Sequence, residues 1–221
     1  IDYILTPLSA GNFVLEINAS DGLNETSRNL ELAVEDPALT VEILALDGYL
    51  AGASLEIKSA QNDYFFLNAQ TNSEGRYTLR LSQQNFQLID QNGNNQIDID
   101  EHTLLVSGGT DLNTGSNFLP TLEGKLPENN DQNFTIVSPI STLCVLLTEA
   151  DSSLSWSEAQ QLVSNSFGID STIDLLAHDP YSSSSVLMPS NPSVQIANLR
   201  LGSLMSGSEA FVKSLDVSYN Y

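Results

Sequence analysis

The sequence is poor in basic residues. Only seven Lys and Arg accompany 28 Asp and Glu in a chain of 221 residues, and the formal net charge is −21. Because such a chain repels phosphates, we expect it to bind neither nucleic acid nor an anionic membrane surface. The same balance is suited to divalent cations, and it keeps a protein soluble in salt water, where self-repulsion is screened.

Cysteine and histidine are also scarce. Cys144 is the single cysteine, which excludes an intrachain disulfide, and no Cys/His cluster is spaced for zinc. Because it falls on the apolar face of a predicted helix, Cys144 is expected to be a buried structural thiol rather than a nucleophile. His102 and His178 accompany no G-x-S-x-G elbow, and no Gly-rich phosphate loop is present. We therefore expect no catalytic residues and no enzymatic activity.

Long apolar runs are missing as well. No stretch is long enough to insert into a membrane, and no signal peptide is present, although 41% hydrophobic residues are typical of a folded protein. The chain also begins without Met, in strand-like sequence. We expect an interior piece of a larger extracellular or cell-surface protein, monomeric as a fragment, in which bound metal replaces disulfides as the source of stiffness.

Residues 90–101 are the most informative stretch. Oxygen-bearing residues stand at positions 1, 3, 5, 7, 9 and 12 of this loop, with the branched apolar Ile97 at position 8. This is the ligand order of an EF-hand or dockerin-like calcium loop, in which position 7 uses its backbone carbonyl. Position 6 departs from the pattern, since it is Asn95 rather than Gly, although Asn also adopts left-handed turns. The alternative is a solvated polar turn. The expected Ca²⁺ ligands are Asp90, Asn92, Asn94, Gln96, Asp98 and Glu101.

Residues 1–37 contain two alternating segments, 12–19 and 29–35, around an Asp21-Gly22 turn. They predict a β-hairpin or two sandwich strands. Residues 17–22 (INASDG) and 34–37 (VEDP) resemble the end of a bacterial cadherin-like or Ig-like repeat. The resemblance implies that Asp21 and Asp36 ligate interdomain calcium, and ordinary turn and linker chemistry is the alternative. The side chains expected to face inward are Phe13, Leu15, Ile17, Ala19, Leu30, Leu32 and Val34.

Residues 38–132 contain further strand-like segments at 39–46, 53–58, 64–67 and 76–81, and short strands with a polar loop are expected in 102–132. This spacing predicts a small antiparallel β-sandwich. Residues 47–53 (DGYLAGA) and 71–79 (TNSEGRYTL) resemble the transthyretin-like, carboxypeptidase-regulatory or Cna-B-type sandwich. The resemblance implies a structural or adhesive module without catalysis.

Residues 133–221 change to a helical period. Ser138-Pro139 predicts the start of a helix that ends near 149, and a capping box from Ser155 to Glu158 starts a second helix that Gly168 ends. The apolar side of this second helix is expected to comprise Trp156, Ala159, Leu162, Val163 and Phe167. A third helix begins at 191–192, and its Gly202 and Gly207 predict a bend or break. Residues 137–143 (VSPISTL) resemble a helical segment of large secreted bacterial adhesins, a resemblance that implies no particular activity.

The sequence therefore predicts an α+β protein, with an Ig- or transthyretin-like antiparallel β-sandwich followed by a small helical segment. The expected units are a repeat end (1–37), the sandwich with its calcium loop (38–132) and the helices (133–221). The expected function is a calcium-binding adhesive module of a large extracellular bacterial protein, with a cell-surface protein or carbohydrate as partner. The alternative is a carbohydrate-binding accessory module of a secreted polysaccharide-active enzyme. Exposure of Tyr49, Tyr64, Phe65 or Trp156 would favour that alternative.

Overall fold

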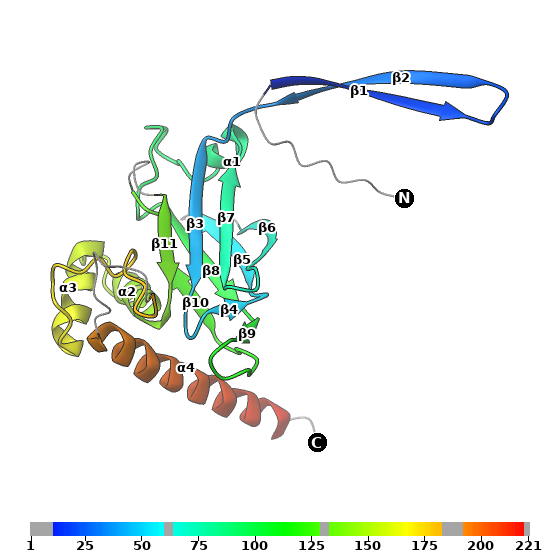
Figure 1. Cartoon of the computed structure of the whole chain (residues 1–221). Coiled ribbons are helices and arrows are strands. Elements are labelled where there is room, and N and C mark those ends of the chain that lie inside the picture. Colours follow the sequence, from blue (N-terminus) through cyan, green and yellow to red (C-terminus); the bar gives the residue numbers. More distant parts are fainter. Residues whose placement is uncertain (1–10, 60–63, 129–132, 183–191, 219–221) are drawn as a thin grey trace.

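The computed structural model describes residues 11–59, 64–128, 133–182 and 192–218, which form a mixed α+β structure (Figure 1). The coarse fold class predicted from the sequence is confirmed. The larger sheet has the strand order β10-β8-β5-β6, and all its neighbouring strands are antiparallel. Its strands are β5 (Ser54–Ser59), β6 (Tyr64–Gln70), β8 (His102–Ser107) and β10 (Thr121–Gly124).

The second sheet has the order β11-β3-β7. Strand β3 (Leu39–Ala45) pairs antiparallel with β7 (Arg76–Leu81) and parallel with β11 (Phe134–Val137). The parallel pair was not expected, because four residues are too few to show a strand period and the sequence around them reads as the start of a helical region. A small two-stranded sheet joins β4 (Leu50–Ala51) to β9 (Thr110–Asp111).

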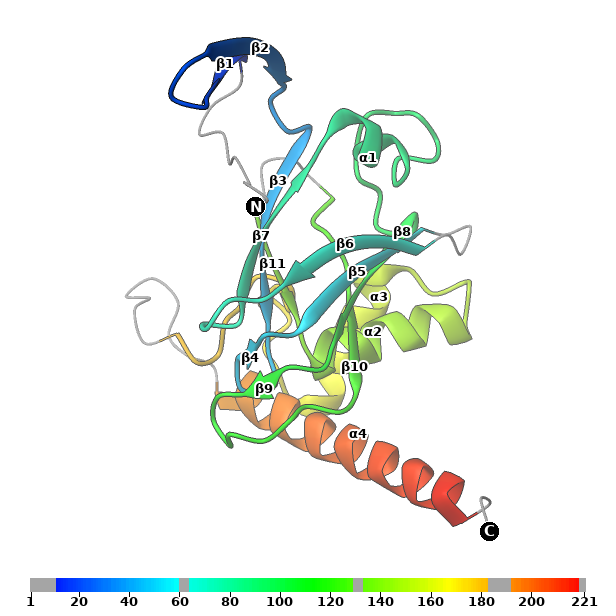
Figure 2. The same ribbon diagram turned by 90° about the vertical axis from the view of Figure 1, so that its right-hand side faces the viewer.

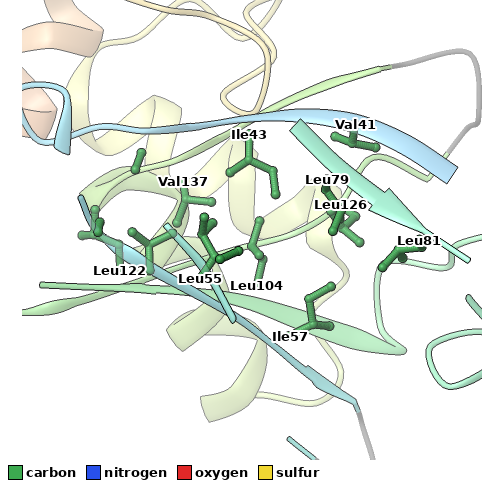
Figure 3. Packing of buried hydrophobic residues seen from close by; sticks show 14 of the residues in the cluster. Val41, Ile43, Leu55, Ile57, Leu79, Leu81, Leu104, Leu122, Leu126 and Val137 are labelled. Atoms are coloured by element: carbon green, nitrogen blue, oxygen red, sulfur yellow. The ribbon is translucent and has the colours of Figure 1, made fainter. Parts of the chain in front are cut away.

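The main core lies between the two larger sheets, whose apolar side chains point toward one another (Figure 3). Alternation along each strand produces this arrangement, since every second side chain faces the same side of a sheet. Removing these side chains from water is the main force that holds the sheets together. The contributing residues include Val41, Ile43, Leu55, Ile57, Leu79, Leu81, Leu104, Leu122 and Val137.

A second core joins the helices. Helix α2 (Pro139–Ala150) packs against β10, against α3 (Trp156–Phe167) and against α4 (Pro192–Ser218). The predicted caps are confirmed: Ser138 and Ser155 each accept a hydrogen bond at the helix start, and Gly168 ends α3 with φ +65°. The expected burial of Leu162 is wrong. Buried members of this core are Ile140, Cys144, Ala159, Val163, Ile169, Leu175, Val194 and Ala197.

Two helical features differ from the expectations. Helix α4 is continuous through Gly202 and Gly207, so the predicted break is wrong. Gly202 is buried against Asp47, and the absence of a side chain there permits a close approach between helix and turn. A short helix, α1 (Gln83–Gln87), begins at Ser82 just before the acidic loop and was not predicted. No helix in the described ranges is long and apolar enough to cross a bilayer.

Strands β1 (Gly11–Ser20) and β2 (Glu25–Val34) form the predicted antiparallel hairpin. It extends away from the two sheets (Figures 1 and 2). The expected burial of its apolar face is wrong in part, because Phe13, Ile17 and Leu30 are 41%, 53% and 48% exposed. Alternation sets the two faces of a strand, but burial also requires a second layer, and the hairpin projects clear of the sheets.

Candidate metal centre

The acidic loop, residues 90–101, connects α1 to β8 and is anchored at its ends and middle. Ile89 and Ile97 are buried in the main core on either side of the loop's first turn. Ile97 occupies position 8, where the sequence pattern expects a branched apolar residue. The polar part of the loop is thus held against the sheets by its own apolar side chains.

The loop wraps around its first residue. Asp90 is 7% exposed, and its Oδ1 and Oδ2 accept hydrogen bonds from the backbone N–H groups of Asn94 (3.1 Å) and Asn95 (2.9 Å). Asn92 Oδ1 accepts from the Asn94 amide at 2.9 Å, and Asn94 Oδ1 accepts from the Gln96 amide at 2.8 Å. The side-chain oxygens at positions 1, 3 and 5 therefore all face backbone N–H groups of the same loop, and the last of these groups belongs to Gln96 at position 7.

The turn depends on a residue in the left-handed region. Asn95 has φ +60°, as the sequence predicts for position 6 of the loop. Asn tolerates this conformation better than other residues with a β-carbon, since its short polar side chain bonds locally. The departure from Gly at this position therefore leaves the loop's path intact.

Asp98, at position 9, lies beside positions 3 and 5. Its Oδ2 accepts hydrogen bonds from the side-chain amides of Asn92 (2.6 Å) and Asn94 (2.8 Å). Three of the predicted ligands thus converge on one point of the loop. An Asn side chain offers both N–H donors and a carbonyl oxygen, so the same residues can face either an anion or a cation.

Glu101, at position 12, closes the loop. Its side chain is 8% exposed, and its Oε1 accepts a hydrogen bond from the Asn92 backbone N–H at 2.9 Å. Its Oε2 is buried without a hydrogen-bond partner, and among the described residues it is the single buried side-chain nitrogen or oxygen in that condition. A buried carboxylate oxygen without a partner is costly and needs a physical explanation.

His102 joins the loop to the larger sheet. Its Nε2 accepts from the Leu126 backbone N–H at 2.8 Å, so the proton must lie on Nδ1, which donates to the Asp98 carbonyl at 3.1 Å. Burial and, to a smaller extent, the positive charge of Lys125 lower the pKa of His102 to about 3. The ring is therefore neutral and positions Asp98. Sequence analysis missed this role, and only the place of His102 directly after Glu101 hinted at it.

Lys125 is a second group that sequence analysis missed. It is buried, and its Nζ donates to the His102 carbonyl and to Thr103 Oγ1. Burial lowers its pKa to about 8, against the smaller opposing effects of nearby carboxylates that include Glu149 and Glu123. The charge lies next to the end of the acidic loop, where it holds the first residues of β8 in place.

Carboxylates alone do not assemble a metal site here. In the part of the chain that the structure describes, no three His, Cys, Asp or Glu side chains are placed together to hold an ion. Asp90, Asp98 and Glu101 would need the oxygens of Asn92 and Asn94 and a backbone carbonyl to complete a coordination sphere. Such a mixed set of oxygens is the usual one for calcium.

Asp21 and Asp36 do not come together. Asp21 caps the hairpin turn, where its Oδ1 accepts from the backbone N–H groups of Leu23 and Asn24 and these bonds lower its pKa. Ser20 pairs with Glu25 at the turn end of the hairpin, close to Asp21. Gly11 pairs with Val34 at the opposite end, and Asp36 follows Val34 there. Ten-residue strands separate the two carboxylates by roughly 30 Å, so they cannot share an ion.

The aromatic residues differ in exposure. Tyr49 is half-buried, its hydroxyl donates to Asp179 at 3.0 Å, and its ring meets Tyr181 edge-on at 5.7 Å. Trp156 is partly exposed at the start of α3. The side chains of Tyr64 and Phe65 lie outside the described residues. Cys144 is buried in the helical core, as expected, and burial raises its pKa to about 12.

The resemblances to cadherin-like repeats, Cna-B-type sandwiches and adhesin helices stay predictions, each carried by its own short motif. Comparison of the chain with protein-family models, with curated proteins and with solved structures gives no match.

Proposed function

We propose that residues 90–101 bind one calcium ion, and that the ion stabilises the fold rather than taking part in catalysis. The observation that supports this most strongly is the buried Oε2 of Glu101, which has no hydrogen-bond partner. Leaving a carboxylate oxygen in this state costs on the order of 1–3 kcal/mol or more. A cation ligated by Glu101 removes that cost.

Each predicted ligand has a role in this proposal. Asp90 and Glu101 supply carboxylate oxygens from the two ends of the loop, and Asn92, Asn94 and Asp98 supply side-chain oxygens between them. Gln96 contributes its backbone carbonyl. The two amide N–H groups now bonded to Asp98 Oδ2 are what a cation would replace.

A solvated polar turn is the competing explanation. Such a turn would leave its acidic side chains in water, where their charges are hydrated at little cost. Asp90 and Glu101 are instead more than nine-tenths buried, and Ile97 fixes the loop against the core. The burial of the two end ligands favours the metal site.

We further propose that the chain is a structural or adhesive module of a large extracellular bacterial protein. Its two main sheets share one apolar core, which supports an Ig- or transthyretin-like β-sandwich. The acidic loop lies beside the helices, since Ile99 of the loop and Trp156 of α3 line the same hollows. An ion there would stiffen both parts together, in the manner of any ligand that binds only the folded state.

The test is a thermal melt of the chain in EDTA and in millimolar calcium. We expect calcium to raise the melting temperature of the wild type by roughly 5–10 °C. An ion at 100 times its dissociation constant adds about 2.7 kcal/mol, which corresponds to about 2–4 °C per kcal/mol in a chain of this size. Asp90→Asn and Glu101→Gln should abolish the shift.

Asp100→Asn is the matched control. Asp100 lies in the same loop at position 11, which carries no predicted ligand, so this variant should keep the calcium shift. No shift in the wild type would exclude the site. An equal loss of shift in Asp100→Asn and Glu101→Gln would show that calcium responds to the general negative charge of the loop and not to the proposed ligands.

A further inference from the structure

Trp156 lines two hollows of the surface. The larger has a volume of about 740 Å³ and the smaller about 360 Å³, and both are lined by Ile99, Glu128 and Trp156. We call the pair the Trp156 groove. The larger hollow alone has the size of a typical ligand site in proteins.

The walls of the larger hollow combine hydroxyl groups with charges of both signs. Lys58 and Lys125 line it, and they are two of the three lysines in the whole chain. Asp100, Glu128 and Glu149 supply carboxylates. The remaining polar residues are mostly small hydroxyl side chains, namely Ser59, Thr103, Thr148, Ser152, Ser153 and Ser155.

The smaller hollow repeats this chemistry. Gln160 and Thr172 each offer both a donor and an acceptor, and Asp174 offers an acceptor. Trp156 packs partly against the helical core and also lines both hollows. A ligand that extended through both hollows would therefore meet this aromatic side chain in each of them.

These walls match the chemistry of sugars. A sugar ring has an apolar face that stacks on an aromatic ring, and hydroxyls that donate to carboxylates and accept from ammonium, amide and hydroxyl groups. Two hollows that share one aromatic side chain suit a linear chain of several rings. We propose that the Trp156 groove binds a linear oligosaccharide, with one ring stacked on Trp156 and with Glu149 and Lys58 bonded to its hydroxyls.

Other polymers fit this groove less well. The net charge of −21 repels nucleic acid. A peptide that added a strand to the sheet would need free backbone groups at the edge strand β10. At that edge the Glu123 N–H already donates to Thr142 Oγ1 at 2.8 Å, and its carbonyl accepts from Ser141 Oγ at 2.6 Å.

The proposal is independent of the calcium site but adjoins it. Ile99 and Asp100 occupy positions 10 and 11 of the acidic loop, which are not predicted ligands, and these two residues line the groove. The binding test is therefore run both in calcium and in EDTA. Binding in either condition supports the groove, whereas the calcium site is tested separately by the thermal shift.

The experiment uses Trp156 as its reporter, because it is the one Trp of the chain. Defined linear oligosaccharides are titrated, in turn cello-, chito-, laminari-, xylo- and alginate-derived, with emission spectra and calorimetry recorded in parallel. We expect at least one of them to shift or quench the emission saturably, with a dissociation constant between micromolar and millimolar. If none of them changes the emission or releases heat at millimolar concentration, the proposal is overturned.

Variants locate the binding. By calorimetry, Trp156→Ala should weaken it about tenfold or more, and Trp156→Phe should retain part of it. Because Trp156 also packs on the helical core, Glu149→Gln serves as a second variant at an exposed position and should weaken binding about fivefold. Glu74→Gln, equally exposed but on the β6–β7 turn, is the control and should bind as the wild type. Equal affinity in all four variants would overturn the assignment to this groove, as would saturable binding of peptides in place of sugars.

Discussion

At the residue scale, Asp47 is the carboxylate whose surroundings oppose its charge most clearly. Burial and, to a smaller extent, the negative charge of the neighbouring Asp111 raise the pKa of Asp47 to about 6. Its side chain is pressed against α4 at Gly202. Tyr181 donates a hydrogen bond to the backbone carbonyl of Asp47 at 3.0 Å, which holds the turn in place without neutralising the side chain.

Stability should therefore depend on Asp47 in a defined pH window. The folded state holds the Asp47 proton up to about pH 6, whereas the unfolded chain loses it near 3.8, the ordinary pKa of an Asp side chain. The contribution of the Asp47 side chain to the free energy of unfolding is therefore fully present below pH 3.8, and it is lost as the pH rises toward 6. We expect Asp47→Asn to flatten the pH dependence over this window and to gain about 1 kcal/mol at pH 7, a value discounted for partial exposure.

The measurement is urea denaturation of wild type and variant at a series of pH values between 4 and 7. Asp170→Asn is the control, because Asp170 is exposed and hydrogen bonds from Thr172 lower its pKa, so its loss should bring no gain at pH 7. A lower stability of Asp47→Asn at pH 7 would contradict the expected repulsion.

At the element scale, α4 contains two glycines with opposite surroundings. A Cβ at Gly202 would lie 2.0 Å from Asp47 Oδ1, whereas a Cβ at Gly207 would meet nothing within 4 Å. We expect Gly207→Ala to stabilise the protein by about 0.5–1 kcal/mol, because Ala loses less conformational freedom in a helix. Gly202→Ala should instead destabilise it by about 1 kcal/mol or more, since the Asp47 carboxylate would have to leave its place against α4.

Chemical denaturation of the two variants tests this contrast, and each serves as the control for the other. Equal effects of the two substitutions would mean that α4 does not dock on the Asp47 turn through Gly202. A loss of stability in both would contradict the helical assignment around Gly207.

The same contrast shows how much the sequence could predict. Ser155, Glu158 and Gly168 act on their own neighbours in the chain, so the ends of α3 were predicted correctly. The break predicted at Gly202 was wrong because this glycine makes room for Asp47, a residue far away in the sequence. Strand β11 was missed for a related reason: Phe134–Val137 becomes a strand through its pairing with β3 and not through a period of its own.

The candidate site divides in the same way. The spacing of oxygen-bearing residues in 90–101 is a local pattern, and the inward turns of Asp90, Asn92 and Asn94 follow from it. The burial of Glu101 and the bridge from His102 to Leu126 depend on how the loop meets the sheet. No spacing rule expresses that contact, so sequence alone could name the expected ligands but not their surroundings.

At the scale of the whole molecule, the hairpin and the body contribute unequally to stability. Nearly all residues of β1 and β2 are exposed, whereas α4 supplies Val194 and Ala197 to the helical core. We expect removal of residues 1–37 to leave the melting temperature unchanged within about 2 °C, because the described strands of this segment bury little apolar surface.

Removal of residues from 192 onward is the matched comparison and should lower the melting temperature by well over about 5 °C, because it opens the helical core. Differential scanning calorimetry of the two shortened chains decides the matter. A large fall on removing residues 1–37 would show that the hairpin packs on the body in solution.

The parallel pairing of β11 with β3 also determines when the protein can finish folding. Strand β3 lies between β7 and β11 in the sheet. Along the chain, roughly ninety residues separate β3 from its parallel partner β11. During synthesis one side of β3 therefore stays open until residue 137 has emerged, and closing so long a loop is slow. Strand β11, the last of the described strands, leads directly into α2, so completion of the sheet and docking of α2 become one late event on the folding pathway.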